Sequence, residues 1–89
     1  MISHTTEKFR KALLKLPNNI KSQAKIAYRQ FKKDPYYPSL QFKCIHNVKP
    51  IYSVRINIDY RAVGIMSDME IVWFWIGTHA EYDKLLTRL

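Results

Sequence analysis

Apolar residues recur with a helical period over the first third of the chain. One helix is predicted over residues 7–16, and its apolar face consists of Phe9, Ala12, Leu13 and Leu16 at spacings of i, i+3, i+4 and i+7. Pro17-Asn18-Asn19 should end this helix, because proline disfavours helical geometry in the residue before it. A second helix is predicted up to Asp34, with its apolar face formed by Ile20, Ala24, Ala27 and Phe31. Two short amphipathic helices joined by a tight turn predict a helical hairpin.

The period of the apolar positions changes to two after the segment 34–40, which has two prolines and should be an ordered loop. Strands are predicted at 42–46, 52–57, 60–66 and 71–76. Because short turns join these strands, they should form an antiparallel meander. The last strand is apolar on both faces, so we expect it to be central or packed on both sides. A short strand at Ile2–Thr5 would add an edge to the sheet.

The final segment returns to helical spacing. A helix is predicted over 79–89, with its apolar face formed by Tyr82, Leu85, Leu86 and Leu89. Thr78 followed three residues later by Glu81 fits a capping box at its start. Two helices, an antiparallel sheet of about four strands and a terminal helix predict an α+β fold. A chain of 89 residues should form one domain, spanning 1–89.

The charge is divided unevenly along the chain. The net charge is +8, with 15 Lys and Arg against 7 Asp and Glu. Residues 1–58 contain 12 of those bases and two acids, whereas residues 59–89 contain three bases and five acids. This asymmetry indicates a polyanionic partner, either nucleic acid or an acidic protein. The competing interpretation is a lysine-rich helix surface that keeps the protein in solution.

Composition also excludes several classes of protein. The longest uncharged apolar run, 71–76, has six residues, which is too short for a transmembrane helix. The N-terminus has no basic head followed by an apolar stretch, so we expect no secretory signal and a cytoplasmic protein without a membrane partner. The only cysteine, Cys44, excludes an internal disulfide and a cysteine-built zinc site. No histidine pair has metal-ligand spacing, and no cofactor is expected.

Two arginines and an aspartate flank the predicted bend at Ile58. Arg55 and Arg61 should project from neighbouring strands onto one surface, where two guanidiniums would make bidentate contacts to phosphate oxygens. The alternative is that Asp59 pairs with one arginine in a surface salt bridge, which is common and weak.

Histidine and tyrosine supply further candidates. His79 lies at the start of the last helix, where an imidazole could transfer a proton near neutral pH. The alternative for His79, and more strongly for His4 and His46, is a residue with no catalytic task. Tyr36-Tyr37 is a candidate base-stacking pair if it is exposed, although packing within the loop would also explain it.

Three segments together resemble the RelE/ParE superfamily of type II toxins. They are residues 38–43 (PSLQFK), 52–61 (YSVRINIDYR) and 75–82 (WIGTHAEY). The Gly-Thr-His-Ala sequence at 77–80 is most similar to the YafQ branch. The resemblance covers nearly the whole chain and implies a helical hairpin packed on a curved antiparallel sheet, with a short C-terminal helix.

The resemblance implies a toxin of a type II toxin–antitoxin system that inhibits translation by cutting mRNA in the ribosomal A site. Such an endoribonuclease uses the ribose 2′-OH to attack the adjacent phosphate without a metal. Its partners would be a cognate acidic antitoxin, the ribosome with its rRNA, and mRNA. Matched by position, the implied catalytic residues are His79, Asp59, Arg61, Arg55 and Tyr82, with Tyr82 stacking on mRNA or aiding proton transfer. The candidate RNA contacts are Lys32, Lys33, Lys43, His46 and Lys49.

This sequence departs from the family pattern at several positions. Tyr52 and Val54 stand where RelE has a lysine pair, and Arg55 stands where the YafQ branch has a histidine. These departures leave the identity of the base open, and we expect Asp59 and His79 to be the general base and the general acid in either order. Two alternatives remain open: a ParE-like toxin that poisons DNA gyrase, and a non-catalytic member that acts only as an antitoxin-binding module.

Overall fold

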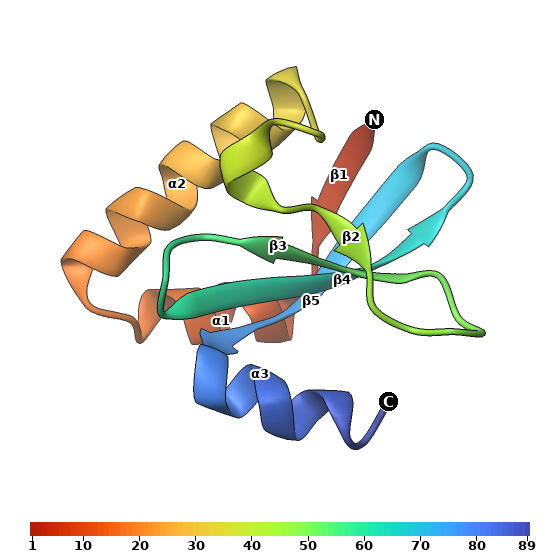
Figure 1. Ribbon diagram of the computed structural model, residues 1–89. Coiled ribbons are helices and arrows are strands. Elements are labelled where there is room, and N and C mark those ends of the chain that lie inside the picture. The colour runs from red at the N-terminus through yellow and green to blue at the C-terminus, as the bar shows by residue number, and fades with distance from the viewer.

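The computed structural model describes residues 1–89 as three helices, one 3₁₀ turn and five strands (Figure 1). In chain order these are β1 (Ile2–Thr5), α1 (Glu7–Leu14), α2 (Asn18–Lys33), the 3₁₀ turn η1 (Pro38–Leu40), β2 (Lys43–Cys44), β3 (Ile51–Arg55), β4 (Tyr60–Ser67), β5 (Glu70–Thr78) and α3 (His79–Leu86). The predicted α+β class and every predicted helix are confirmed.

Local sequence explains where the helices begin and end. The Thr6 side chain caps α1 by accepting a hydrogen bond from the backbone N–H of Phe9 at 3.1 Å. α1 ends at Leu14, two residues before Leu16, whose helical geometry Pro17 disfavours. The predicted capping box of α3 is present, with Thr78 and Glu81 hydrogen-bonded to each other's backbone.

The loop predicted over 34–40 contains an element that the pattern did not indicate. Its second proline, Pro38, occupies the first position of η1, where a missing N–H carries no penalty. The turn buries Leu40 to 2 % exposure under the sheet. The segment is thus an anchored connection between α2 and the sheet.

The sheet has five strands in the order β1-β5-β4-β3-β2. The four strands from β2 to β5 form the predicted antiparallel meander. The predicted edge strand at Ile2–Thr5 is present as β1, and it pairs with β5 in parallel, so the sheet is mixed where antiparallel pairing alone was expected. Two parallel strands must be joined by a long chain segment, and the segment between β1 and β5 contains α1 and α2. β2 is only two residues long, shorter than the predicted strand 42–46.

The side chains of β5 pack into a hydrophobic core on each face of the sheet, as the apolar sequence of this strand predicts. Ile71, Trp73 and Ile76 belong to the main core beneath α1 and α2, whereas Phe74 and Trp75 pack with the smaller core beneath α3. Two consecutive residues share one face because the β4–β5 register shifts between Val63 and Gly64, which leaves Phe74 unpaired. Such a bulge bends a strand and increases its twist.

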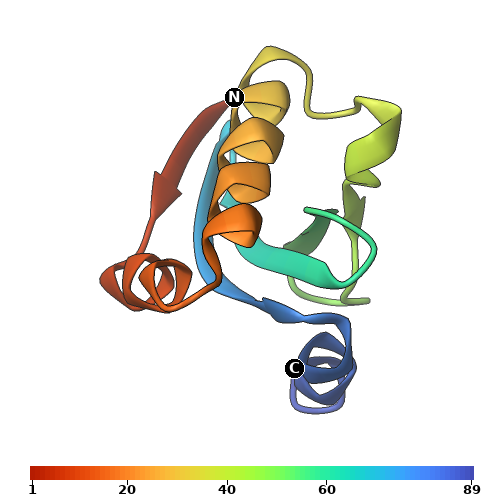
Figure 2. The same cartoon turned by 90° about the vertical axis from the view of Figure 1, so that its left-hand side faces the viewer.

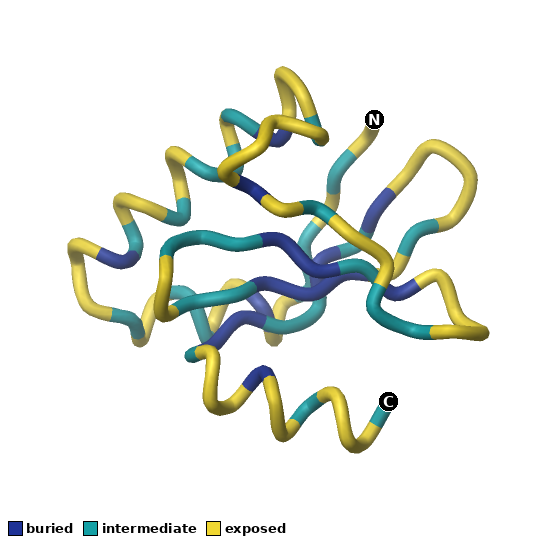
Figure 3. Tube along the Cα trace, in the orientation of Figure 1, coloured by how far each residue is buried: buried dark blue, intermediate teal, exposed yellow.

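The helices divide between the two faces of the sheet. Figure 2 shows α2 along the sheet, with α3 set apart at the chain's C-terminal end. Buried residues concentrate in the middle strands, whereas the helices expose most of their outer surface (Figure 3). None of the three helices is both long enough and apolar enough to cross a lipid bilayer. On the α3 face, the turn that joins β3 to β4 lies beside the start of α3, where the backbone N–H of His79 is hydrogen-bonded to the carbonyl oxygen of Asp59.

Candidate functional site

Two arginines face each other at the turn end of the β3–β4 hairpin. Arg55 and Arg61 are direct partners in the antiparallel register, so their side chains leave the sheet on the same face, as predicted. Neither guanidinium lies within 4.0 Å of a carboxylate. Like charges placed opposite each other on a sheet are destabilising. A pair of guanidiniums without a direct ion-pair partner favours an anion that is not part of the protein.

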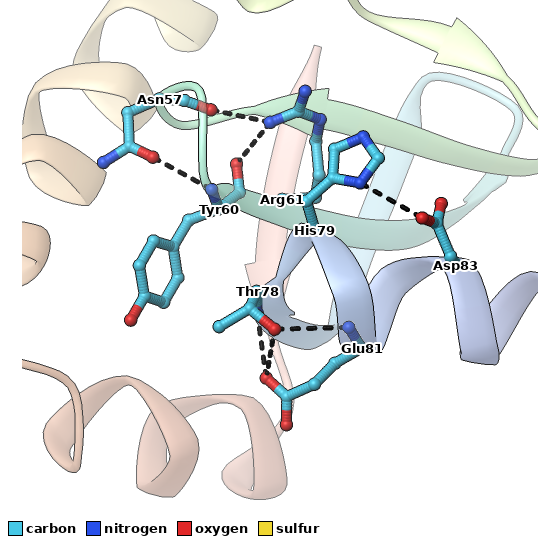
Figure 4. Close-up of polar contacts among 7 residues, drawn as sticks. All are labelled: Asn57, Tyr60, Arg61, Thr78, His79, Glu81 and Asp83. Carbon is cyan, nitrogen blue, oxygen red and sulfur yellow. Dashed lines mark hydrogen bonds and ion pairs between the residues drawn. The ribbon is translucent and has the colours of Figure 1, made fainter.

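Backbone carbonyls fix the position of one of these two guanidiniums. Nη1 of Arg61 donates hydrogen bonds to the carbonyl oxygens of Asn57, at 2.6 Å, and Tyr60, at 3.0 Å (Figure 4). Partial burial lowers the pKa of Arg61, and the neighbouring Arg55 lowers it further. Because an arginine pKa starts far above neutral pH, Arg61 keeps its charge. It is a half-buried cation whose direction is set before any substrate arrives.

Asn57 organises the turn that carries Arg61. Its Oδ1 accepts hydrogen bonds from the backbone N–H groups of Asp59, at 2.8 Å, and Tyr60, at 2.9 Å. Its Nδ2 donates to Oε1 of Gln23, which connects the turn to α2. The sequence indicated a bend at this position but assigned Asn57 no part in the site. The tendency of asparagine to bond to the backbone two residues ahead was the available signal.

His79 is connected to the same turn through the backbone. Its N–H donates a hydrogen bond of 2.7 Å to the carbonyl oxygen of Asp59. Its Nδ1 lies 3.3 Å from a carboxylate oxygen of Asp83, and Nε2 has no partner within the protein. Figure 4 shows the imidazole and the Arg61 guanidinium projecting to the same side. An imidazole oriented at Nδ1 by a carboxylate and free at Nε2 can exchange a proton with a substrate.

The carboxylate of Asp83 was not among the predicted site residues. It follows His79 by four positions on a predicted helix, which places the two side chains on one face. That spacing was the signal that could have identified it.

The exposed carboxylate of Asp59 makes no ion pair. The alternative interpretation, in which Asp59 forms a salt bridge with Arg55 or Arg61, was therefore wrong. Both backbone groups of Asp59 are engaged in the turn and in the contact to His79, so its side chain is held at the edge of the site while remaining accessible.

Tyr82 does not have the exposure that stacking on RNA requires. It is 6 % exposed, and its hydroxyl is hydrogen-bonded to Oγ of Ser53 at 3.1 Å beneath α3. The reason is its position on the apolar face of α3, against Trp75 and the sheet. The expectation that Tyr82 stacks on mRNA is corrected accordingly. The residue instead holds α3, and thus His79, against β3, and its ring edge lies near the imidazole, with 5.9 Å between the centroids.

The predicted RNA contacts are distributed over the surface. Lys43 pairs with Ser53 in the β2–β3 register, so it shares a sheet face with the arginine pair. Nδ1 of His46 accepts hydrogen bonds from the backbone N–H groups of Val48 and Lys49, so this imidazole organises a turn next to the exposed Lys49.

The two lysines at the end of α2 lie apart from the arginine pair. Gln23 of α2 contacts the turn at Asn57, and Lys32 is nine residues further along, about 14 Å at 1.5 Å per residue. Lys32 lies over the ring of Tyr28 at 4.8 Å, and Lys33 follows it at the exposed end of the helix.

The site is an open surface. Neither of the two main hollows of the protein includes His79 or Arg61. No group of three or more His, Cys, Asp or Glu side chains has a geometry that could hold a metal ion. An open arrangement of guanidiniums, imidazole and carboxylate is accessible to a long polyanionic chain.

Several solved structures share this fold at low sequence identity. The RelB–RelE antitoxin–toxin complex from Methanococcus jannaschii matches at a TM-score of 0.74 and 16 % identity, covering 92 % of this chain and 96 % of that one. YafQ from E. coli matches at 0.71 and 13 %, covering 90 % and 94 %. The YoeB/ParE toxin from Agrobacterium tumefaciens matches at 0.68 and 14 %, covering 89 % and 99 %. RelE, YafQ and YoeB are thus matched about equally well.

Sequence comparison gives the family directly. No curated protein matches this chain at a significant level. The family model of the ParE-like toxin domain matches residues 18–84, which include both arginines, His79 and the turn between them. The predicted resemblance is confirmed: the chain belongs to the ParE-like toxin domain family, within the RelE/ParE superfamily of toxins.

Proposed function

We propose that this protein is the toxin of a type II toxin–antitoxin pair and cleaves mRNA on the ribosome without a metal ion. One observation carries the proposal: the Arg55–Arg61 pair, which makes no ion pair with a carboxylate, lies beside an imidazole whose Nδ1 contacts Asp83. This combination provides phosphate binding and proton transfer on one surface.

The arginine pair would stabilise the charge that develops during cleavage. Attack of a ribose 2′-OH on the adjacent phosphorus forms an O–P bond, and breaking the P–O5′ bond leaves a 2′,3′-cyclic phosphate. The intervening phosphorane carries more negative charge than the phosphodiester. Guanidiniums that are already oriented stabilise such charge without reorganising, and Arg61 is held by two carbonyl oxygens.

His79 and Asp59 are the groups placed to transfer the protons. One would take the proton of the 2′-OH and the other would give a proton to O5′. The hydrogen bond between His79 N–H and Asp59 carbonyl keeps the two residues adjacent, whichever has each role. Tyr82 would act as a positioning residue, because its buried hydroxyl cannot reach a substrate.

The charge of the chain supports the proposed partners. The bases of residues 1–58, including Lys32, Lys33, Lys43 and Lys49, would contact rRNA and mRNA phosphates in the cytoplasm. An acidic antitoxin would neutralise the same surface. RelB–RelE complexes from Methanococcus jannaschii and Pyrococcus horikoshii are among the structures with this fold, which supports an antitoxin partner here.

A second candidate function is poisoning of DNA gyrase, because the matching family model is the ParE-like one. Poisoning of gyrase does not require an imidazole next to a phosphate-binding site, whereas RNA cleavage does. RNA cleavage is therefore the preferred function. A non-catalytic antitoxin-binding module would equally leave these side chains unused.

One experiment in cells separates these functions. The protein is expressed from a tightly controlled promoter, and RNA ends and gyrase-dependent DNA breaks are mapped from the same culture. RNA cleavage predicts new 5′-OH ends within coding sequences and intact chromosomes. DNA breaks with intact mRNA would establish the gyrase function, and normal growth with neither kind of break would establish the binding module.

A further inference from the structure

A second hollow adjoins the candidate active site on the α2 side. It has a volume of about 460 Å³ and lies between α2, η1 and the β3–β4 turn. Its polar lining comes from Gln23, Gln30, Tyr37, Ser39, Arg55 and Asn57. From the sequence, Arg55 was assigned to the site and Tyr37 was a candidate for base stacking, whereas the other four residues were not singled out.

Small side chains keep this hollow open. Gln23, Ala27 and Gln30 recur at i, i+4 and i+7 and so lie on one face of α2, with the short Ala27 between the two amides. Ser39 contributes an equally short side chain from η1. The result is a recess with an apolar floor and amide groups at its rim.

Tyr37 provides an aromatic surface that the protein does not use. It is 44 % exposed and belongs to none of the aromatic pairs. Its neighbour Tyr36 is different, because it lies outside the hollow and its ring meets Phe42 edge-on at 5.7 Å. An unpaired, half-exposed ring is the kind of surface on which an unstacked base packs.

The amide of Gln30 is the hydrogen-bonding group left free in the hollow. Gln23 already accepts a hydrogen bond from Asn57, whose own Oδ1 is occupied by two backbone N–H groups. The Gln30 side chain has no hydrogen bond within the protein. A free primary amide offers a donor and an acceptor side by side, which matches the paired groups on the edge of a nucleobase.

Arg55 connects this hollow to the active site. It lines the hollow and is also the cross-strand partner of Arg61. The Arg55 side chain leaves the sheet with that of Arg61 on the α3 face, whereas the hollow lies on the α2 face, so an RNA strand would pass around the end of β3 to reach from the arginine pair to the hollow.

We propose that this hollow binds one nucleobase of the RNA, with the base stacked on Tyr37 and its edge hydrogen-bonded to Gln30. The proposal rests on the proposed function, because it makes the hollow the base-recognition subsite of the cleavage site. It predicts that Tyr37 and Gln30 influence where the RNA is cut, while the arginine pair and His79 determine whether it is cut.

Binding is tested by NMR titration of the full-length protein with adenosine 5′-monophosphate, and with ribose 5-phosphate as the probe without a base. The nucleotide should shift the backbone amide signals of Gln30, Tyr37 and Ser39, and ribose 5-phosphate should not. Tyr37→Ala should weaken nucleotide binding by about 5- to 100-fold, the range found when a stacking aromatic is removed. Tyr36→Ala is the matched control and should bind as the wild type does. Equal shifts with both probes, or equal weakening by both variants, would overturn the base subsite.

A cleavage experiment shows whether the base belongs to mRNA. Wild type, Tyr37→Ala and Tyr36→Ala are compared on ribosomes carrying the same mRNA, and the cut positions are sequenced. Tyr37→Ala should redistribute the cuts while still cleaving, and Tyr36→Ala should reproduce the wild-type pattern. An unchanged distribution for Tyr37→Ala would overturn the assignment to mRNA even if the nucleotide binds. If the wild type itself does not cleave, the proposed function fails, and the titration alone decides whether the hollow binds a base.

Discussion

The backbone N–H of His79 donates a hydrogen bond of 2.7 Å to the carbonyl oxygen of Asp59. This bond joins the first residue of α3 to the turn between β3 and β4, two segments that are separated in the chain by the whole of β4 and β5. The same turn fixes the Arg61 guanidinium through the carbonyls of Asn57 and Tyr60. Proton transfer and phosphate binding are therefore supported by one small piece of backbone.

Replacement of His79 tests the role of the imidazole. His79→Ala should lower the cleavage rate by about 10²- to 10⁴-fold, the usual contribution of a positioned acid or base, and should abolish growth arrest. The side chain is half exposed, so the fold should survive, as circular dichroism would show. The control is His4→Ala at the far edge of the sheet, where the imidazole is equally exposed and contacts only Glu70. Undiminished toxicity of His79→Ala would remove this residue from the mechanism.

Replacement of Arg61 tests the phosphate site. Arg61→Ala should cost about 3–4 kcal/mol of transition-state stabilisation, because it removes an oriented cation from the developing charge. Arg61→Lys should recover only part of the rate, since an ammonium lacks the planar fork of the guanidinium. The measurement is the rate constant of single-turnover cleavage. The control variant is Arg29→Ala, which removes one positive charge from the exposed face of α2. A rate equal to that of Arg29→Ala would reduce Arg61 to a structural residue.

The buried contact between Tyr82 and Ser53 predicts an effect on stability that is separate from chemistry. Tyr82→Phe leaves the Ser53 hydroxyl buried without its partner and should lower the free energy of unfolding by about 1–3 kcal/mol. Tyr82→Phe combined with Ser53→Ala removes both groups and should recover much of that loss. The measurement is denaturant unfolding of the wild type, Tyr82→Phe, Ser53→Ala and the double variant, which together form a double-mutant cycle. Cleavage by folded Tyr82→Phe should stay close to the wild-type rate, whereas a loss of several hundredfold would restore a direct catalytic role.

The capping box at the start of α3 predicts a pH dependence of stability. Hydrogen bonds from the backbone and side chain of Thr78 lower the pKa of Glu81 below its ordinary value of 4.5. The unfolded chain therefore binds this proton more tightly than the folded one. The stabilisation is present above pH 4.5 and disappears as pH falls through the lowered pKa.

Glu81→Gln should remove that part of the acid sensitivity. Its effect at neutral pH should be less than about 1 kcal/mol, because the carboxylate is exposed and screened by solvent. Free energies of unfolding measured between pH 7 and pH 2 would show a shallower decline for the variant. Parallel curves for variant and wild type would mean that the Glu81 charge contributes nothing to folding.

Periodicity predicted the elements well because most of them are amphipathic or alternate regularly. The facing arginines followed from the bend at Ile58, which placed Arg55 and Arg61 on adjacent strands. The same logic applied to Tyr82: its place on the apolar face of the last helix indicated burial, and only the family resemblance had suggested an exposed ring.

The features that were not predicted depend on contacts between distant segments. The bulge at Phe74 arises from the β4–β5 pairing, and the parallel pairing of β1 depends on the path of both helices. The part played by Asn57 involves Gln23 in another element, as well as its own turn. The site geometry therefore required the assembled sheet, whereas the types of residue in it could be identified from the chain.

The central claim is that one surface holds a scissile phosphate and transfers its protons. The most direct measurement is the end chemistry of a defined mRNA incubated with purified protein and programmed ribosomes. We predict cuts in the A-site codon that leave 5′-hydroxyl and 2′,3′-cyclic phosphate ends, require ribosomes and disappear with His79→Ala. Intact mRNA under these conditions, or ends carrying a 5′-phosphate, would contradict the account.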